Sequence, residues 1–182
     1  MGGTGGFFAP VNFADLTTVV ARDGTYRTQA VYTIKNRRRQ FLALQLPEGS
    51  QLLSVLLQDQ PARSVSATVA GKKAHLVALP KTSEADLSFP VKVVIAGRLP
   101  KPLPKKTSFA SDEIEIPSPQ VISQTDDEAF GIPTARTRWT VYLADDLEAN
   151  AVTDASKHNL TTTPEGAAKI VQAQSAIQEL NE

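Results

Sequence analysis

The stretch TYRTQAVYTI, residues 25–34, decides the fold. Its side chains alternate between two faces, and the bulkier ones share the face that is formed by Tyr26, Thr28, Ala30, Tyr32 and Ile34. A period of two residues is typical of a β-strand with one buried face, because successive side chains of a strand point to opposite sides. The stretch therefore predicts a half-buried β-strand.

Turn residues on either side of this stretch predict two hairpins. Asp23-Gly24 is a turn dipeptide, and the β-branched segment 16–21 before it reads as the partner strand of the first hairpin. Downstream, the apolar runs 41–46 and 51–58 flank the sequence 47–50, Pro-Glu-Gly-Ser, in which proline fixes φ and glycine permits positive φ. We expect these two runs to pair as a second hairpin.

The same alternation continues to about residue 96. Residues 63–70 and 74–79 flank a turn at residues 71–73 and predict a third hairpin. Residues 86–96 predict a further strand, in which Pro90 removes one hydrogen-bond donor and indicates an edge position or a bulge. About seven strands at a spacing of roughly ten residues are typical of an all-β fold. We predict an antiparallel β-sandwich, immunoglobulin-like in general architecture, with about 7–9 strands; closure into a barrel stays open.

The chain changes character after residue 98. Residues 99–106 contain three prolines and predict an extended crossing segment. Residues 113–116 predict a short strand, and residues 137–143 a longer one whose Trp139, the single tryptophan, is expected to fill the core.

These patterns divide the chain into three parts. Residues 1–14 are expected to be a flexible lead-in, residues 15–147 the β-sandwich domain, and residues 148–182 a loop followed by a C-terminal helix. The helix prediction rests on Thr163-Pro164 as its start and on an apolar stripe at Ile170, Ala173, Ile177 and Leu180. The stripe reaches the end of the sequence without a capping residue, so we interpret the chain as a piece of a longer polypeptide.

Composition excludes several function classes. The 19 Lys and Arg residues balance the 19 Asp and Glu residues, so there is no net positive charge to attract nucleic acid. Cysteine is absent, which excludes disulfides, thiolate metal sites and a cysteine nucleophile. No apolar run approaches the roughly 18–20 residues of a membrane-spanning helix, so we expect no transmembrane segment.

The residues that could carry chemistry do not form a known motif. The two histidines, His75 and His158, lie in separate segments, and no nucleophile or metal-binding motif surrounds them. The acidic residues 126–128 (Asp126, Asp127 and Glu128) and 145–146 (Asp145 and Asp146) resemble a calcium-binding loop in composition but lack its spacing and its glycine. Whether the loop at Asp126 binds a cation stays open. We expect no catalytic, cofactor-binding or metal-binding residue and no cofactor.

The basic and aromatic residues likewise form no recognised binding motif. Residues 37–39 are three arginines at a predicted turn, and Lys101, Lys105 and Lys106 lie near the prolines; neither group is interleaved with aromatic residues, so both are interpreted as solvated turns. A carbohydrate-binding surface needs exposed aromatic side chains. The few candidates are Phe7, Phe8, Tyr26 and Tyr32.

One resemblance adds to this picture. The succession Tyr32 to Asn36, then Gln40 to Gly49, then Leu52 to Val55 resembles β-sandwich modules of very large bacterial envelope or surface proteins. The resemblance covers roughly residues 16–99. It implies a scaffold or interaction part of a longer, exported chain, in a location outside the cytoplasm or in the cell envelope, and it implies no catalytic site.

The sequence thus leads to a non-enzymatic β-sandwich module of a larger protein that mediates protein–protein contacts or spaces other domains. Its expected partners are other domains or proteins of a larger assembly. The alternative from another class is a carbohydrate-binding module of an extracellular enzyme. A third hypothesis, an enzyme that uses the carboxylates near Asp126 and Asp145, has the least support.

Overall fold

The computed structural model describes residues 11–36, 40–69, 71–80, 87–104, 114–124, 129–131, 134–144 and 147. These residues form eleven β-strands: β1 Val11–Val20, β2 Thr25–Ile34, β3 Phe41–Gln45, β4 Gln51–Leu57, β5 Gln60–Pro61, β6 Ser64–Val69, β7 Lys72–Ala78, β8 Phe89–Arg98, β9 Gln120–Gln124, β10 Ala129–Gly131 and β11 Thr137–Tyr142. The flexible lead-in predicted for residues 1–14 is wrong for residues 11–14, which belong to β1, and residues 1–10 lie outside the described residues. The predicted C-terminal helix lies outside the described residues.

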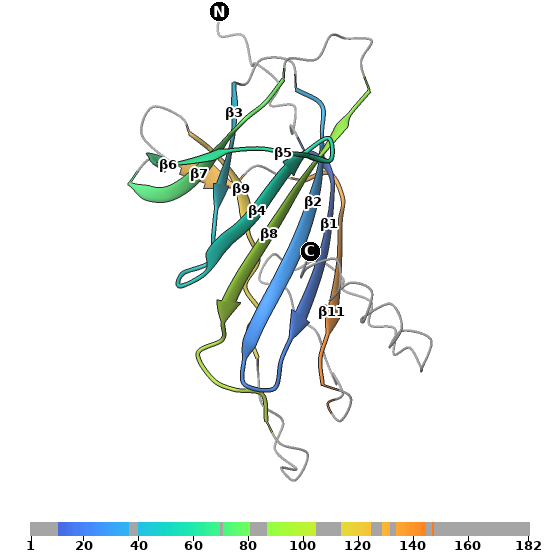
Figure 1. The fold of residues 1–182 in the computed structure, drawn as a ribbon, viewed down its shortest axis with the longest axis vertical. Helices are drawn as coiled ribbons and strands as arrows, with labels where there is room; N and C mark the ends of the chain where they lie inside the picture. The colour runs from blue at the N-terminus through green and yellow to red at the C-terminus, as the bar shows by residue number, and fades with distance from the viewer. Residues whose placement is uncertain are drawn as a thin grey trace, which may run out of the picture.

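The strands form two sheets that pack as a β-sandwich, as predicted. The six-stranded sheet has the order β11-β1-β2-β8-β4-β5, and the five-stranded sheet has the order β10-β9-β3-β7-β6. In Figure 1, β4, β8, β2, β1 and β11 run side by side, and β3, β6, β7 and β9 lie on the other layer near the top of the view. No strand belongs to both sheets among these eleven, so the described fold is a sandwich and not a closed barrel.

The hairpin of β1 and β2 is confirmed and forms the centre of the larger sheet. Every second residue of β2 from Tyr26 to Ile34 is buried, as its alternation predicts. The turn between the strands is closed by a hydrogen bond from the Gly24 amide to the Ala21 carbonyl, and Gly24 has a φ of 85°. That value favours glycine, because a side chain there clashes with the backbone.

The predicted hairpin of β3 and β4 is wrong. β3 pairs with β7 and β9 in the five-stranded sheet, whereas β4 pairs with β8 and β5 in the six-stranded sheet. The turn at residues 47–50 exists, with Ser50 donating both its amide and its hydroxyl to the Pro47 carbonyl. It carries the chain from one sheet to the other. The same turn residues that can close a hairpin therefore connect strands of two different sheets here.

The hairpin of β6 and β7 is confirmed, with six consecutive residue pairs from Ser64↔Val77 to Val69↔Lys72. Its turn is tighter than predicted, because Lys72 and Lys73 already belong to β7 and Gly71, with φ 77°, supplies the sharp bend.

The interpretation of Pro90 as an edge or bulge marker is wrong. β8 lies in the middle of its sheet, between β2 and β4, and pairs with β2 without a register shift. Pro90 is the second residue of β8, opposite Thr33, where a missing donor affects only the start of the strand. Leu87, which lies within the strand predicted at residues 86–96, precedes β8 and is 88% exposed.

The strand that carries Trp139 is confirmed as β11, but its pairing and its burial differ from expectation. β11 is parallel to β1, so the larger sheet is mixed. Trp139 is 37% exposed and lies at this edge of the sheet instead of filling the core. Its indole Nε1 donates to the Thr18 hydroxyl at 2.9 Å, and Thr18 also shares a buried hydrogen bond with Thr28 at 2.8 Å. Trp139 therefore covers the edge of the sheet and supplies a hydrogen-bond donor to the buried Thr18 hydroxyl.

Irregular segments complete the core. Leu99 and Leu103 are buried, and their amides donate to the carbonyls of Gly24 and Arg22, which fixes the crossing segment against the first turn. Ile114 and Ile116 pack against the same core but belong to no strand, so the strand predicted at residues 113–116 is not present at the described residues 114–116. No helix in the described part of the chain is long and apolar enough to cross a membrane.

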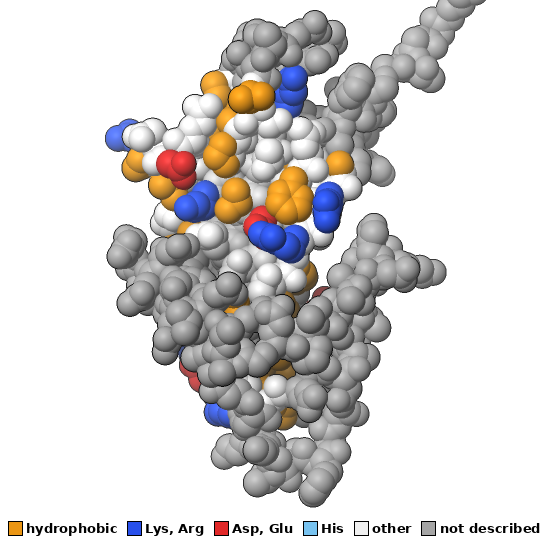
Figure 2. Space-filling view, turned by 90° about the vertical axis from the view of Figure 1, so that its right-hand side faces the viewer, with side chains coloured by type: hydrophobic (Ala, Val, Ile, Leu, Met, Phe, Trp, Pro, Cys, Tyr) orange, Lys and Arg blue, Asp and Glu red, His pale blue; other side chains and the backbone are white. Residues whose placement is uncertain are grey.

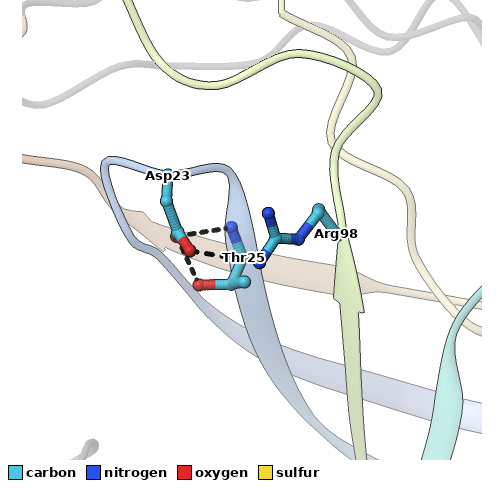
Figure 3. Close-up of polar contacts among 3 residues, drawn as sticks. All are labelled: Asp23, Thr25 and Arg98. Carbon is cyan, nitrogen blue, oxygen red and sulfur yellow. Dashed lines mark hydrogen bonds and ion pairs between the residues drawn. The ribbon is translucent and has the colours of Figure 1, made fainter.

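The first turn contains a polar cluster that makes a testable prediction (Figure 3). The Asp23 carboxylate accepts hydrogen bonds from the Thr25 hydroxyl (2.6 Å) and the Thr25 amide (3.0 Å), and it pairs with Arg98 at 3.3 Å. These contacts, the Thr25 hydroxyl first, lower the pKa of Asp23. Contacts that lower the pKa of an aspartate stabilise the folded state at pH values above the pKa of the unfolded chain, which is about 3.9. This stabilisation is lost as the pH falls through the lowered pKa of the folded state.

Asp23→Asn should therefore flatten the acid side of the stability profile. Between about pH 5 and pH 2 the melting temperature of the parent protein is expected to fall more than that of the variant, whereas at pH 7 the variant is the less stable. Thermal unfolding followed by circular dichroism measures both profiles, with Glu48→Gln at an exposed turn as the control. Parallel profiles for parent and Asp23→Asn would contradict the role of this turn.

Candidate interaction surface

The five-stranded sheet has apolar side chains on both of its faces. Leu42 and Leu44 of β3 are 1% and 0% exposed and belong to the main core between the sheets. Ala43, between them, must point away from that core, because successive side chains of a strand alternate. It lies directly opposite Leu76 of β7 on one side and Ile122 of β9 on the other. A second apolar row therefore crosses the sheet on its outer side.

This outer row is part of a separate hydrophobic cluster. Val69, Ala74 and Ile122 are buried there, and Ala43 and Leu76 are packed against them, with none of the five in the main core. Cross-strand pairs extend the cluster to β6 and to the start of β3. We call the whole set the outer patch and define it by Phe41, Ala43, Val65, Ala67, Val69, Ala74, Leu76, Ala78 and Ile122.

The rim of the outer patch is open. Val65, which pairs with Leu76, is 63% exposed, and Phe41, which pairs with Ala78, is 46% exposed. A single exposed apolar side chain is ordinary on a protein surface, but a contiguous set across several strands marks a contact site. An antiparallel sheet more commonly has one core face and one polar face. The outer patch thus departs from the usual pattern of such a sheet.

The charges of the five-stranded sheet all have one sign. None of its five strands contains Asp or Glu, whereas β7 begins with Lys72 and Lys73 and Arg63 precedes β6; all three side chains are exposed. The charges that these strands carry, and that of Arg63 directly before β6, are therefore positive, whereas the acidic residues 126–128 between β9 and β10 lie outside the described residues. The positive charges favour partners whose contact segments carry carboxylates.

The outer side of the six-stranded sheet is different. Asp15 of β1 accepts hydrogen bonds from Nε of Arg138 at 2.9 Å and from its Nη2, and these bonds raise the pKa of Arg138. Figure 2 views the side of the molecule that carries β11 and shows hydrophobic side chains interrupted by Lys, Arg, Asp and Glu. Such a mixed, charged surface is typical of a solvated face.

The histidines and acidic loops predicted as weak candidates do not meet in the described structure. His75 lies in β7, half-buried, opposite Leu44 and Ser66. His158, the acidic residues 126–128 and Asp145 and Asp146 lie outside the described residues. Where the chain is described, no three His, Cys, Asp or Glu side chains gather as metal ligands.

The basic residues and the aromatic candidates are also placed only in part. Lys101 is exposed in the crossing segment, whereas residues 37–39, Lys105 and Lys106, like Phe7 and Phe8, lie outside the described residues. Tyr26 and Tyr32 are each 3% exposed, and burial raises the pKa of both phenols. The Tyr32 hydroxyl donates to the Pro119 carbonyl at 3.0 Å. Neither tyrosine is available as a carbohydrate platform.

The sequence contains a pattern that indicates the outer patch, although alternation alone does not reveal it. Residues 41–44 and 74–79 are nearly continuous apolar runs, interrupted in the second by His75. A strand with one solvated face alternates, whereas a strand covered on both faces reads as a continuous apolar run. β3 and β7, the two neighbouring strands with these runs, are the strands whose outer sides form the middle of the patch.

Comparison with known proteins adds little to this geometry. No protein-family model and no curated protein matches the chain. Among solved structures, the M1 zinc metallopeptidase from Deinococcus radiodurans aligns at a TM-score of 0.37 and 18% identity, over 49% of this chain and 20% of that chain. A mutant of that enzyme bound to a Tyr-Ser-Ala substrate aligns at a TM-score of 0.41 and 20% identity, over 73% of this chain and 32% of that chain.

The native LTA4 hydrolase of yeast aligns at a TM-score of 0.32 and 12% identity, over 47% of this chain and 14% of that chain. This chain therefore spans a third or less of the length of the peptidases it matches. A likeness of this size carries no argument about activity.

Proposed function

We propose that the chain is a non-enzymatic β-sandwich module that binds a partner protein through the outer patch. The observation that carries the proposal is the presence of two separate hydrophobic clusters on the two faces of one sheet. The inner cluster holds the sandwich together. The outer one is buried at Val69, Ala74 and Ile122 and exposed at its rim, at Val65 and Phe41, and this rim is the part that is proposed to bind the partner.

Burial of this rim would favour association. Removing apolar surface from water contributes about 25 cal/mol per Å², and aromatic side chains are frequent anchors of protein interfaces. Phe41 supplies such an anchor at one margin of the patch, and Val65 supplies a β-branched side chain at another. The proposal assigns the module no reaction.

The proposal also concerns the larger protein to which the module belongs. The resemblance of residues 16–99 to modules of bacterial envelope proteins supports a place in a larger, exported polypeptide, with the partner in the same assembly. The carbohydrate-binding alternative has lost two of its four aromatic candidates to the core, and nothing in the described structure favours it over protein binding.

Site-specific photo-crosslinking tests the proposal. A photoreactive phenylalanine analogue is placed at Val65 in the natural full-length polypeptide, in the cells that produce it, and adducts are sequenced by mass spectrometry. Leu87 is the matched control, because it is an even more exposed apolar residue outside the outer patch. We expect one defined protein adduct from position 65, re-formed with the purified partner, and none from position 87.

Two results would overturn the proposal. Equal adducts from both positions would show that position 65 is merely exposed. Cross-links from position 65 that lead only to other segments of the same module would show that the chain covers its own patch.

A further inference from the structure

The free edge of the five-stranded sheet at β6 differs from the other sheet edges. β6 consists of Ser64, Val65, Ser66, Ala67, Thr68 and Val69, six residues without charge or proline. Its pairing with β7 is continuous, with no bulge. Among the described residues β7 is the single partner of β6, and no described strand pairs with the backbone donors and acceptors on its other side.

The remaining edge strands carry the usual protection. Protein edges are protected by shortness, proline, charge or bulges, because an open edge is a template for another strand. β5 has two residues, one of them Pro61, and the part of β4 that β5 leaves unpaired carries a bulge between Leu52 and Ser54. β10 has three residues. β11 carries the charged Arg138. β6 has none of these devices over its full length.

From this edge we infer that the partner of the outer patch binds as an extended strand, which pairs with β6 and adds a sixth strand to the five-stranded sheet. The inference rests on the proposed function and names the form of the partner. Strand addition of this kind draws its affinity from backbone hydrogen bonds and its specificity from alternate side chains.

Side chains of β6 define the sequence that fits. Val65, Ala67 and Val69 lie on the side of the outer patch, whereas Ser66 and Thr68 alternate with them on the other side. A bound strand should therefore alternate apolar residues with small polar ones. Arg63 lies before one end of β6 and Lys72 and Lys73 after the other, so acidic residues are favoured at both ends of the bound strand.

The same charges disfavour a second copy of this chain as the occupant. Two β6 strands paired antiparallel bring the Arg63 end of one copy to the Lys72 end of the other, which places like charges together at both ends. Paired parallel, two Arg63 side chains meet. A foreign strand with carboxylates at its ends avoids this repulsion.

A blocked seven-residue peptide, with three valines alternating with two threonines between terminal glutamates, tests the inference. We expect saturable binding with shifts of the β6 amide signals in nuclear magnetic resonance spectra of the isotope-labelled protein. The same peptide with terminal lysines should bind about threefold to tenfold more weakly. Absence of saturable binding by both peptides, or equal binding of the two, would overturn the inference.

Two proline variants separate strand pairing from loss of fold. In an antiparallel edge strand, neighbouring residues direct their amides alternately to the paired strand and to the open side. Of Ser66→Pro and Ala67→Pro, the one whose amide faces the open side should keep its melting temperature and lose peptide binding. The other proline variant should lose stability, because its proline removes a backbone hydrogen bond between β6 and β7.

The folded proline variant also distinguishes this inference from the proposed function. If the adduct from position 65 disappears in that variant, pairing with β6 is supported. If the adduct to the partner persists, strand addition is wrong and docking on the outer patch stands. If the parent protein itself gives no adduct, the proposed function fails. A dimer of this chain that the proline variant dissolves would contradict the choice of a foreign strand.

Discussion

Replacing Leu44 by alanine is expected to lower the free energy of unfolding by about 2–5 kcal/mol. Leu44 is fully buried on the inner side of β3, where it lies opposite His75 and Val121. Truncation removes its buried apolar surface and leaves a cavity between two sheets that cannot close around it. Urea unfolding at equilibrium, followed by circular dichroism, measures the loss.

Val65→Ala is the matched control for this prediction. Val65 lies in the same sheet but points outward and is 63% exposed, so its truncation should change the stability by less than about 0.5 kcal/mol. A similar loss for both variants would contradict the assignment of inner and outer faces, on which the docking proposal depends.

Gly97→Ala is expected to cost about 1–3 kcal/mol of stability although it adds a single methyl group. Gly97 of β8 lies directly opposite Tyr26 of β2, and a Cβ atom there would be 2.5 Å from the Tyr26 hydroxyl oxygen and 2.6 Å from Cζ. The ring therefore lies across the glycine backbone. Since Tyr26 is 3% exposed, it has little free space into which it can move.

A double-mutant cycle checks this cause. In a Tyr26→Ala background the ring that causes the clash is gone, so Gly97→Ala should cost much less than in the parent protein. An equal cost in both backgrounds would mean that the methyl group acts on something other than Tyr26.

The alternation in the sequence was enough to predict the sandwich but not the order of its strands. Residues 25–34 specify a strand because each residue type fits its side of the sheet, which is a local property. The turn at Pro47 looks the same whether the next strand pairs with β3 or crosses to the other layer. That choice depends on which surfaces the two strands bury, and therefore on the partners β7, β8 and β9.

Long-range pairing also explains the other differences. Inside a strand a proline removes a needed hydrogen-bond donor, but the place of Pro90 at the start of β8 makes the missing donor unimportant. The size of Trp139 alone favours a place in the core. Its strand pairs in parallel with β1 at the sheet edge, a contact more than 100 residues away in sequence that no local pattern contains.

The interaction surface could have been predicted in part. The apolar runs at residues 41–44 and 74–79 indicate strands covered on both faces, whereas alternation assigns only one face of each strand to the core. What the runs could not show is that β3 and β7 are neighbours, with β6 beside them as the edge. That adjacency turns separate apolar residues into one patch with an open strand at its margin.

The cross-link at position 65 identifies the partner. Docking on the outer patch is then tested most directly by measuring the affinity of the purified partner for two charge variants of this chain. Val65→Glu adds a carboxylate to the outer patch, and Gln29→Glu adds the same charge to the outer side of the other sheet. We predict that Val65→Glu weakens binding about tenfold or more and that Gln29→Glu changes it less than about twofold. Unchanged affinity for Val65→Glu, or an equal loss for both variants, would contradict the account.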